Sequence, residues 1–398
     1  MGRMILIKIA FMIINFIKVL LFYTFRIFPI QKKVVATCFK GQKYGDNPQF
    51  ILEELNKLDN SIDLVWLRNK DWTYEVPNWM RVSLYNLRVR TIYELSTAKV
   101  WIDTHRLRTQ IRKRKGQVFI ETWHGGLGIK KIEGDVEEFR NLKWLMDEVS
   151  HTNRLANVFI SQSDHLTNIY RRAFGYTGPV YKSGYPKNDI LFTDKREVSM
   201  RIRSYFELPK EIKLFLYAPS FRDYFYQGIN TDVYDVDFVS VKTALERRFG
   251  GQWGVIVRWH PLFAKQLNEK LGGFPVINAT SYPDMQELIL SVDAMLSDYS
   301  SCLFDGALRE IPCFTYAKDF DKYKEERGVY FEMDELPFPY AKNNDELISN
   351  ILNYNHDDYI EKWKQFTIRT GLHETGHATE DIANKIIDIL NGKKVVWE

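Results

Sequence analysis

The sequence predicts an α/β protein whose two halves are each built on a parallel sheet and are preceded by an apolar N-terminal helix. Short apolar runs, typical of buried strands, alternate with helical patterns, and this alternation favours parallel sheets. The alternation restarts near residue 213, after a polar segment. A chain of 398 residues is also too long for one typical core. We therefore expect an N-terminal helix at 1–30 and two domains at 31–207 and 208–398.

The composition excludes several classes of protein. A hydrophobic content of 45% and a charged content of 27% are ordinary for a globular protein. A net charge of +4 is small for this length, so no nucleic-acid partner is predicted. Cys38, Cys302 and Cys313 have no paired spacing, which argues against a disulfide framework or a zinc ribbon and indicates a reducing compartment.

The first segment, residues 4–28, is almost wholly apolar. Lys8, Lys18 and Arg26 interrupt it, and at about 100° per residue they lie with Asn15 on one narrow stripe. This pattern is typical of a helix that lies in the membrane interface. A transmembrane anchor and a helix docked on the protein itself stay open as alternatives. No small-residue cleavage site follows, so a cleaved signal peptide is not predicted.

The remaining elements follow in chain order. In the first half we predict helices at 50–58, 87–96 and 164–174, and strands at 34–39, 64–67, 98–103, 116–120, 157–161 and from Val180. In the second half, predicted strands begin near 213, 254, 274, 294 and 311, with helices at 285–291, 302–308, 345–352 and 379–390. Two halves of similar size suggest a cleft between them, where ligands commonly bind.

The densest basic segment is residues 105–115, with the sequence HRLRTQIRKRK. It could contact anionic lipid head groups or a phosphate-rich acceptor, and a solvated loop is the alternative.

The segment ETWHGGLGIKK, residues 121–131, follows a predicted buried strand. His124 therefore lies at the carboxyl end of a strand, where open α/β sheets bind ligands, and an imidazole titrates near neutral pH. Gly125 and Gly126 allow a close approach of the backbone to a ligand, and Lys130 and Lys131 suit an anion. The alternative is a buried histidine before a glycine turn.

Two further patterns in the second half suit phosphate groups. Arg258 and His260 alternate at a strand end, so their side chains point to the same face. The sequence SDYSS at 297–301 precedes a helix, where hydroxyls and free N–H groups would bind a diphosphate. An ordinary salt bridge and a serine N-cap are the alternatives.

The sequence HETGH, residues 373–377, matches the zinc-protease pattern by letter only. That site needs a helix, whereas Gly376 lies inside the segment and the next helix is predicted to start near Ala378. No metal site is therefore predicted.

Several motifs together resemble a known family. The motifs, in order, are KYGDNP, WHGGLGIKK, SGYPKND, YAPSFRD, RWHP, SYPDMQELIL, SDYSSCLFD and residues 316–331. Over about residues 34–390 the chain resembles the CDP-glycerol glycerophosphotransferase family, which includes the teichoic acid primases and polymerases.

The resemblance implies a GT-B-like fold, with two Rossmann-type domains facing a central cleft. The domain at 31–207 would bind the acceptor and that at 208–398 the CDP-linked donor. The implied reaction transfers a polyol phosphate, glycerol phosphate first among them, from a CDP-activated donor to a hydroxyl and releases CMP. The acceptor would be lipid-linked or a polyol-phosphate polymer, in teichoic acid or capsular polymer synthesis. The protein would be peripheral or monotopic on the cytoplasmic face of the cell membrane.

The resemblance also implies roles for single residues. His124 resembles the general base, and His260 with Arg258 resembles the pair that handles the donor phosphates and the leaving group. Further donor-binding positions are Asp298, Ser300, Ser301, Asp284 and Glu287. No cofactor is required, while a divalent cation, the identity of the polyol and the oligomeric state stay open.

Two departures from the family pattern concern the acceptor. Gly125 and Gly126 stand in a loop where the family often has Thr-Pro after WHG, which suggests a different acceptor. The long N-terminal extension of some polymerases is not seen here, so chain extension is not assured. The alternatives are a GT-B glycosyltransferase that uses a sugar nucleotide and a non-catalytic, membrane-bound polymer-binding protein. The retained His124, Arg258 and His260 argue against the second.

Overall fold

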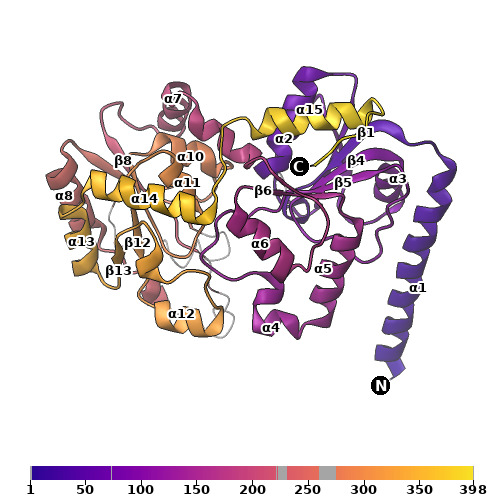
Figure 1. The fold of residues 1–398 in the computed structure, drawn as a ribbon, viewed down its shortest axis with the longest axis horizontal. Coiled ribbons are helices and arrows are strands. Elements are labelled where there is room, and N and C mark those ends of the chain that lie inside the picture. Colours follow the sequence, from indigo (N-terminus) through magenta and orange to yellow (C-terminus); the bar gives the residue numbers. More distant parts are fainter. Residues whose placement is uncertain (1, 73, 221, 223–230, 260–274, 398) are drawn as a thin grey trace. The chain divides into compact units, whose positions relative to one another are not determined.

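The computed structural model describes residues 2–72, 74–220, 222, 231–259 and 275–397. The described strands form two sheets, one of seven strands in the order β3-β2-β1-β4-β5-β6-β7 and one of six in the order β10-β9-β8-β11-β12-β13 (Figure 1). Every pairing between neighbouring strands in these sheets is parallel. The predicted α/β class with two parallel sheets is therefore confirmed.

The first sheet has the strand order of a Rossmann fold around β1, and helices flank it. Its strands are β1 (Gln31–Ala36), β2 (Asp63–Arg68), β3 (Arg81–Leu84), β4 (Ala98–Asp103), β5 (Val118–Glu121), β6 (Val158–Ser161) and β7 (Val180–Lys182). The associated helices are α2 (Asp46–Leu58), α3 (Val89–Thr97), α4 (Glu137–Arg140), α5 (Lys143–Leu155), α6 (Asp164–Ala173) and α15 (Ala378–Leu390), with short turns η2 (Phe39–Gly41), η3 (Glu133–Asp135) and η4 (Pro186–Phe192).

The second sheet repeats the same arrangement. Its strands are β8 (Lys213–Tyr217), β9 (Trp253–Val257), β10 (Ile277–Asn278), β11 (Ala294–Ser297), β12 (Cys313–Tyr316) and β13 (Tyr340–Ala341). The helices are α7 (Arg196–Tyr205), α8 (Phe238–Phe249), α10 (Met285–Ser291), α11 (Cys302–Leu308), α12 (Phe320–Glu326), α13 (Asn344–Leu352) and α14 (His356–Thr370), with turns η6 (Thr231–Tyr234) and η7 (Met333–Glu335). The central strands are buried on both faces, which is why they are near-continuous apolar runs in the sequence.

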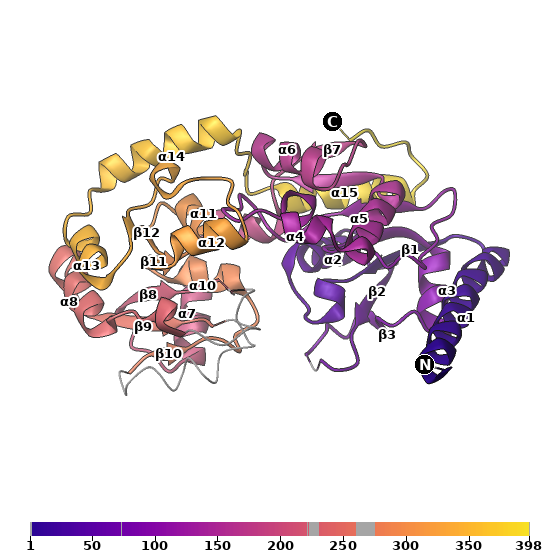
Figure 2. The same cartoon turned by 90° about the horizontal axis from the view of Figure 1, so that it is seen from below.

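The chain divides into two compact units that are interleaved in sequence. The first comprises Met1–His124, Glu133–Asp189 and His373–Glu398, and the second comprises Gly125–Ile132 and Ile190–Leu372. This division differs from the predicted boundary at 207/208, because α7 packs in the second unit and α15 packs beside α2 in the first (Figure 2). An amphipathic helix shows from its sequence that it has a buried face, but not which sheet covers it.

The N-terminal helix α1 (Gly2–Thr24) leads into the short turn η1 (Phe25–Ile27). It is long and apolar enough to cross a membrane, yet little of it is buried. Its C-terminal end is anchored, because Phe22 is 1% exposed within the core of the first unit and Leu21 packs against that core. Large apolar side chains along the rest of α1, such as Phe11 and Phe16, are exposed.

The basic segment 105–115 is mostly used within the first unit. Arg106 is buried and pairs with Glu133. Lys113 donates to the Leu155 carbonyl, and burial lowers the pKa of this lysine to about 8. Arg114 donates to the carbonyls of Arg26 and Phe28, at 3.2 and 2.9 Å. These three cations therefore hold the body of the unit and the end of the N-terminal helix in place.

Candidate functional site

The turn that carries His124 follows β5 and is strained. Trp123 has a φ of +53°, a left-handed conformation that a bulky residue rarely adopts. A carboxyl oxygen of Glu121 accepts the N–H of Trp123 at 2.9 Å, and the Asn47 amide donates to the Trp123 carbonyl at 3.2 Å. Such strain persists only where neighbouring groups enforce it, and it is common at functional sites. Glu121 and Asn47 are the groups that enforce it here.

The imidazole of His124 has a defined orientation. Its Nδ1 lies 2.8 Å from the Thr104 carbonyl oxygen. Because a carbonyl can only accept, Nδ1 holds the hydrogen and Nε2 has the lone pair in the neutral ring. The half-buried ring contacts those of Phe39 and Trp123, with centroids 4.7 and 4.3 Å away, and His105 lies at 5.7 Å. Nε2 is therefore the nitrogen that can accept a proton.

A pair of buried carboxyl groups supports this arrangement. Asp103 and Glu121 are partners in the register between β4 and β5, and both are almost fully buried. Asp103 accepts the N–H groups of Thr104 and His105, at 2.7 and 3.1 Å, which fixes the carbonyl that orients His124. Burial raises the pKa of Asp103 well above its ordinary value. Burial and the nearby Asp103 carboxyl do the same to the pKa of Glu121.

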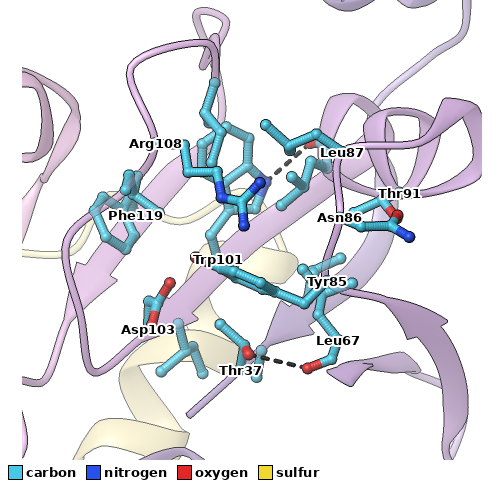
Figure 3. A pocket seen from close by; sticks show the side chains of 16 residues that line it. Thr37, Leu67, Tyr85, Asn86, Leu87, Thr91, Trp101, Asp103, Arg108 and Phe119 are labelled. Atoms are coloured by element: carbon cyan, nitrogen blue, oxygen red, sulfur yellow. Dashed lines mark hydrogen bonds between the residues drawn. The ribbon is translucent and has the colours of Figure 1, made fainter. Parts of the chain in front are cut away.

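A mostly apolar pocket borders Asp103 in the first unit (Figure 3). Trp101 and Phe119 line it from β4 and β5, and Leu107 lines it from the basic segment. Arg108 also lines the pocket, with its guanidinium 5.5 Å from the ring centroid of Tyr85. This apolar wall is one source of the desolvation that keeps the Asp103 carboxyl protonated to higher pH.

Three of the sequence motifs meet at Asn47 of KYGDNP, a side chain with no exposed surface. Its amide donates to Trp123 of the WHGG motif, and its oxygen accepts the N–H of Lys187 of SGYPKND at 3.2 Å. The buried ammonium of Lys187 donates to the His124 carbonyl at 3.3 Å. The sequence predicted neither Asn47 nor Lys187, although both lie in motifs that carry the resemblance.

The HETGH segment holds the SGYPKND turn. The Glu374 carboxylate accepts the N–H of Tyr185 at 3.1 Å and the amide of Asn188 at 2.9 Å. Gly184 has a φ of +83°, and a Cβ there would lie 2.6 Å from the Glu374 carboxylate. Asp189 accepts the N–H of Thr379 at 2.7 Å, at the start of α15. The role of this segment is therefore explained by backbone contacts inside the first unit.

The glycine-rich loop after His124 belongs to the second unit. Lys130 forms an antiparallel bridge with Val329, and the N–H of Lys131 donates to Gly328 at 3.0 Å. Leu127 and Ile129 have no exposed surface within the core of that unit. Gly125 and Gly126 thus lie where the chain passes from one unit to the other, directly after His124. The expected anion-binding roles of Lys130 and Lys131 stay predictions.

In the second unit, Arg258 follows β9 and is largely desolvated. Its guanidinium contacts the Met285 sulfur at 3.6 Å, and among the described residues it has no ion pair. Burial lowers the pKa of Arg258, while the Asp284 charge opposes this effect. A half-buried guanidinium without a close ion pair in the described part of the chain suits an anionic ligand at this position. His260, predicted beside it, lies outside the described residues.

The SDYSS turn is built around Asp298, which is 1% exposed. Its carboxylate accepts the N–H groups of Ser220 and Tyr299, at 2.8 and 2.6 Å, and the guanidinium of buried Arg222 at 2.7 Å. Asp298 is therefore fully engaged in holding the turn. Ser300 and Ser301 are half-buried at the start of α11, and the Ser300 hydroxyl oxygen accepts the N–H of Cys302 at 3.4 Å.

The two acidic residues expected near the nucleotide also have local partners. Asp284 caps α10 by accepting the N–H of Glu287 at 3.0 Å. The Glu287 carboxylate binds Arg201 and the Tyr282 hydroxyl. Both contacts stabilise α10 behind Arg258, and their predicted role toward the nucleotide stays a prediction.

Comparisons with known proteins identify a family model and relatives that match most of this chain. The family model described as CDP-Glycerol:Poly(glycerophosphate) glycerophosphotransferase matches residues 20–388. The teichoic acid poly(glycerol phosphate) polymerase of Bacillus subtilis (strain 168) is 28% identical over 371 residues, which are 90% of this chain and 49% of the polymerase. The chain thus spans about half the length of that relative. The teichoic acid glycerol-phosphate transferase of Staphylococcus aureus (strain NCTC 8325 / PS 47) is 26% identical, covering 90% of this chain and 93% of the transferase.

Among solved structures, the H548A form of the wall teichoic acid polymerase TagF is similar, with a TM-score of 0.78 and 25% identity. The similarity covers 91% of this chain and 90% of the TagF chain. The fold is thus shared along nearly the whole length of both chains. The chain belongs to the CDP-glycerol:poly(glycerophosphate) glycerophosphotransferase family.

Proposed function

We propose that this protein transfers glycerol phosphate from CDP-glycerol to an acceptor hydroxyl in teichoic acid synthesis and releases CMP. Family membership and the TagF structure soaked with CDPG support the donor. The observation that best supports the chemistry is the orientation of His124. Its Nδ1 hydrogen is donated to the Thr104 carbonyl, so Nε2 carries the lone pair of the neutral ring, as a base requires.

In the proposed reaction, the acceptor oxygen forms a bond to the β-phosphorus of CDP-glycerol, and the bond from that phosphorus to the CMP oxygen breaks. The acceptor proton passes to Nε2 of His124. The Thr104 carbonyl then stabilises the imidazolium, because Nδ1–H already points at it. Phosphoryl transfer needs positioning, neutralisation of charge and such a base.

We infer that the donor diphosphate is bound in the second unit by Arg258 and by the serines at the start of α11, Ser300 and Ser301. The absence of an ion pair at Arg258 among the described residues supports this assignment. Asp298 then acts by positioning the turn, and Asp284 and Glu287 by positioning α10. His260 is assigned to the leaving group by resemblance alone. No cofactor is needed for these steps, and activity in the presence of EDTA tests for a divalent cation.

We also propose that α1 binds the cytoplasmic face of the cell membrane, as a peripheral or monotopic element. Exposed apolar side chains along most of its length support this, as does its attachment to the core of the first unit near its C-terminal end, at Leu21 and Phe22. A lipid-linked acceptor would then be presented at the same surface.

The decisive experiment identifies the nucleotide released by the purified, detergent-solubilised protein. CDP-glycerol, CDP-ribitol and sugar nucleotides are each supplied with membrane lipid or poly(glycerol phosphate) as acceptor. CMP from CDP-glycerol supports the proposal, and CMP from CDP-ribitol alone replaces the donor. A nucleoside diphosphate from a sugar nucleotide would instead establish a glycosyltransferase. Release from no donor, with donor binding retained, would favour a polymer-binding protein.

A further inference from the structure

Lys43 lies beside His124 in the first unit and is not used by the steps above. Its ammonium lies 5.0 Å from the ring centroid of Phe39, and the Phe39 ring lies 4.7 Å from that of His124. Because both distances are measured from the Phe39 ring, their sum places the ammonium within roughly 10 Å of the imidazole. Lys43 is therefore a cation close to the proposed base.

The Lys43 side chain is held in place, yet its charge is only weakly compensated. A Cβ on Gly45 would lie 3.3 Å from its Cε, so the lysine stem runs closely over that glycine. The nearest carboxylate is Asp46, whose oxygen is 4.0 Å away, at the outer limit for an ion pair. The ammonium donates no hydrogen bond within the described part of the chain, and its side chain is 39% exposed. Three donors thus remain for a ligand.

Other lysines near His124 are differently placed. Lys40 lies 3.7 Å from Glu148 in an ion pair, and burial lowers its pKa. Lys187 is buried and donates to the His124 carbonyl. Lys43 is more exposed than Lys40, with 39% against 30% of its side chain accessible, and its carboxylate partner is farther away, at 4.0 against 3.7 Å.

We propose that Lys43 binds the terminal phosphodiester of the acceptor, so that the site selects an acceptor whose reacting hydroxyl is one glycerol phosphate unit from a phosphate. This inference rests on the proposed function and names its acceptor class. With bonds near 1.5 Å, the hydroxyl oxygen and the phosphorus of one extended glycerol phosphate unit are about 6 Å apart. This length is compatible with a hydroxyl at Nε2 of His124 and a phosphate at the ammonium of Lys43, which lies within roughly 10 Å of the imidazole ring.

The consequence is a preference for extending a phosphodiester chain over starting one on a neutral sugar. A neutral glycan end offers no anion at this distance, so it gains nothing from Lys43. A charge-assisted contact of this kind also weakens as the salt concentration rises.

The test is two-substrate kinetics with Lys43→Met and two matched acceptors on the same lipid tail. One acceptor ends in two glycerol phosphate units, and the other ends in an uncharged glycerol ether. We expect Lys43→Met to raise the KM for the phosphate acceptor about tenfold, the loss of one such contact, with kcat and the KM for CDP-glycerol unchanged. The KM for the uncharged acceptor should stay the same, and Lys43→Arg should restore the wild-type values.

The control variant is Lys57→Met, which removes an exposed lysine of α2 whose partner is Glu54 at 3.0 Å. It should behave as wild type. An equal loss with both acceptors, a rise in the KM for CDP-glycerol alone, or no change in Lys43→Met would each overturn the proposal.

A binding measurement separates this proposal from the proposed function. Isothermal titration of a glycerol phosphate trimer needs no donor and no turnover, and we expect weaker binding to Lys43→Met than to wild type or Lys57→Met. Equal binding to all three contradicts the acceptor site. A wild-type protein that binds the trimer through Lys43 but releases no CMP contradicts only the transferase.

Discussion

The Thr104 carbonyl, a backbone acceptor, orients the imidazole of His124. His124→Gln removes the base and leaves the surrounding turn intact, so we expect turnover to fall about 10²–10⁴-fold with an unchanged melting temperature. The measurement is CMP release at saturating acceptor, with thermal melts in parallel. His356→Gln, at the exposed start of α14, is the control and should keep full turnover. Near-normal turnover in His124→Gln would remove this residue from the mechanism.

The buried Glu121 carboxyl links the same turn to the pH dependence of stability. Its pKa is raised well above 4.5 in the folded protein, so the folded state keeps a proton that the unfolded chain releases. The corresponding stability is present below about pH 4.5 and is lost as the pH rises through the folded pKa, by at most about 1.4 kcal/mol per pH unit.

Glu121→Gln keeps an oxygen to accept the N–H of Trp123 and removes this titration. We therefore expect the unfolding free energy of the variant, measured with urea, to rise relative to that of the wild type as the pH increases from 5 to 8. An unchanged difference in unfolding free energy across this range would show that the carboxyl does not hold a proton.

At the scale of elements, helix α1 is exposed along most of its length and buried near its C-terminal end. Phe16 is 68% exposed on the free part of the helix, whereas Phe22 is 1% exposed in the core of the first unit. Phe16→Asp should weaken sedimentation with phosphatidylglycerol-containing vesicles and leave the melting temperature unchanged. Phe22→Ala should instead destabilise the protein by about 3–5 kcal/mol. Equal vesicle binding by wild type and Phe16→Asp would contradict a membrane role for this helix.

Strands that are buried on both faces could be predicted from the sequence. Helices with one buried and one exposed face were more difficult to predict. The apolar runs that became β4, β5 and β11 were predicted because a parallel strand buries both faces. Helix α14 was not predicted, although its buried residues Tyr359, Trp363, Phe366 and Thr370 recur at helical spacing. Acidic and basic residues between them obscured that pattern.

At the scale of the whole molecule, the motifs predicted which residues mark the site, but not the contacts that hold those residues in place. His124 and Arg258 could be named because their motifs place them at strand ends. Asp103 and Glu121 could not be paired, because only the parallel register of β4 and β5 brings them together. Asn47 and Lys187 are far apart in sequence, and the Lys187 backbone N–H donates to the Asn47 side-chain oxygen, a contact that no local pattern encodes. Long-range pairings of this kind are set by the fold.

The interleaved units lead to a prediction about Leu127, which lies in the sequence of the first half but in the core of the second unit. Leu127→Ala should destabilise by about 2–5 kcal/mol, the usual cost of a cavity in a packed core. In native-state hydrogen exchange, the lost protection should fall on β8, β9 and β11, since these strands share that core. Ile92→Ala, in the core of the first unit, is the matched control and should expose β1 and β4 instead. Lost protection confined to the first sheet in Leu127→Ala would mean that the loop after His124 folds with the other unit.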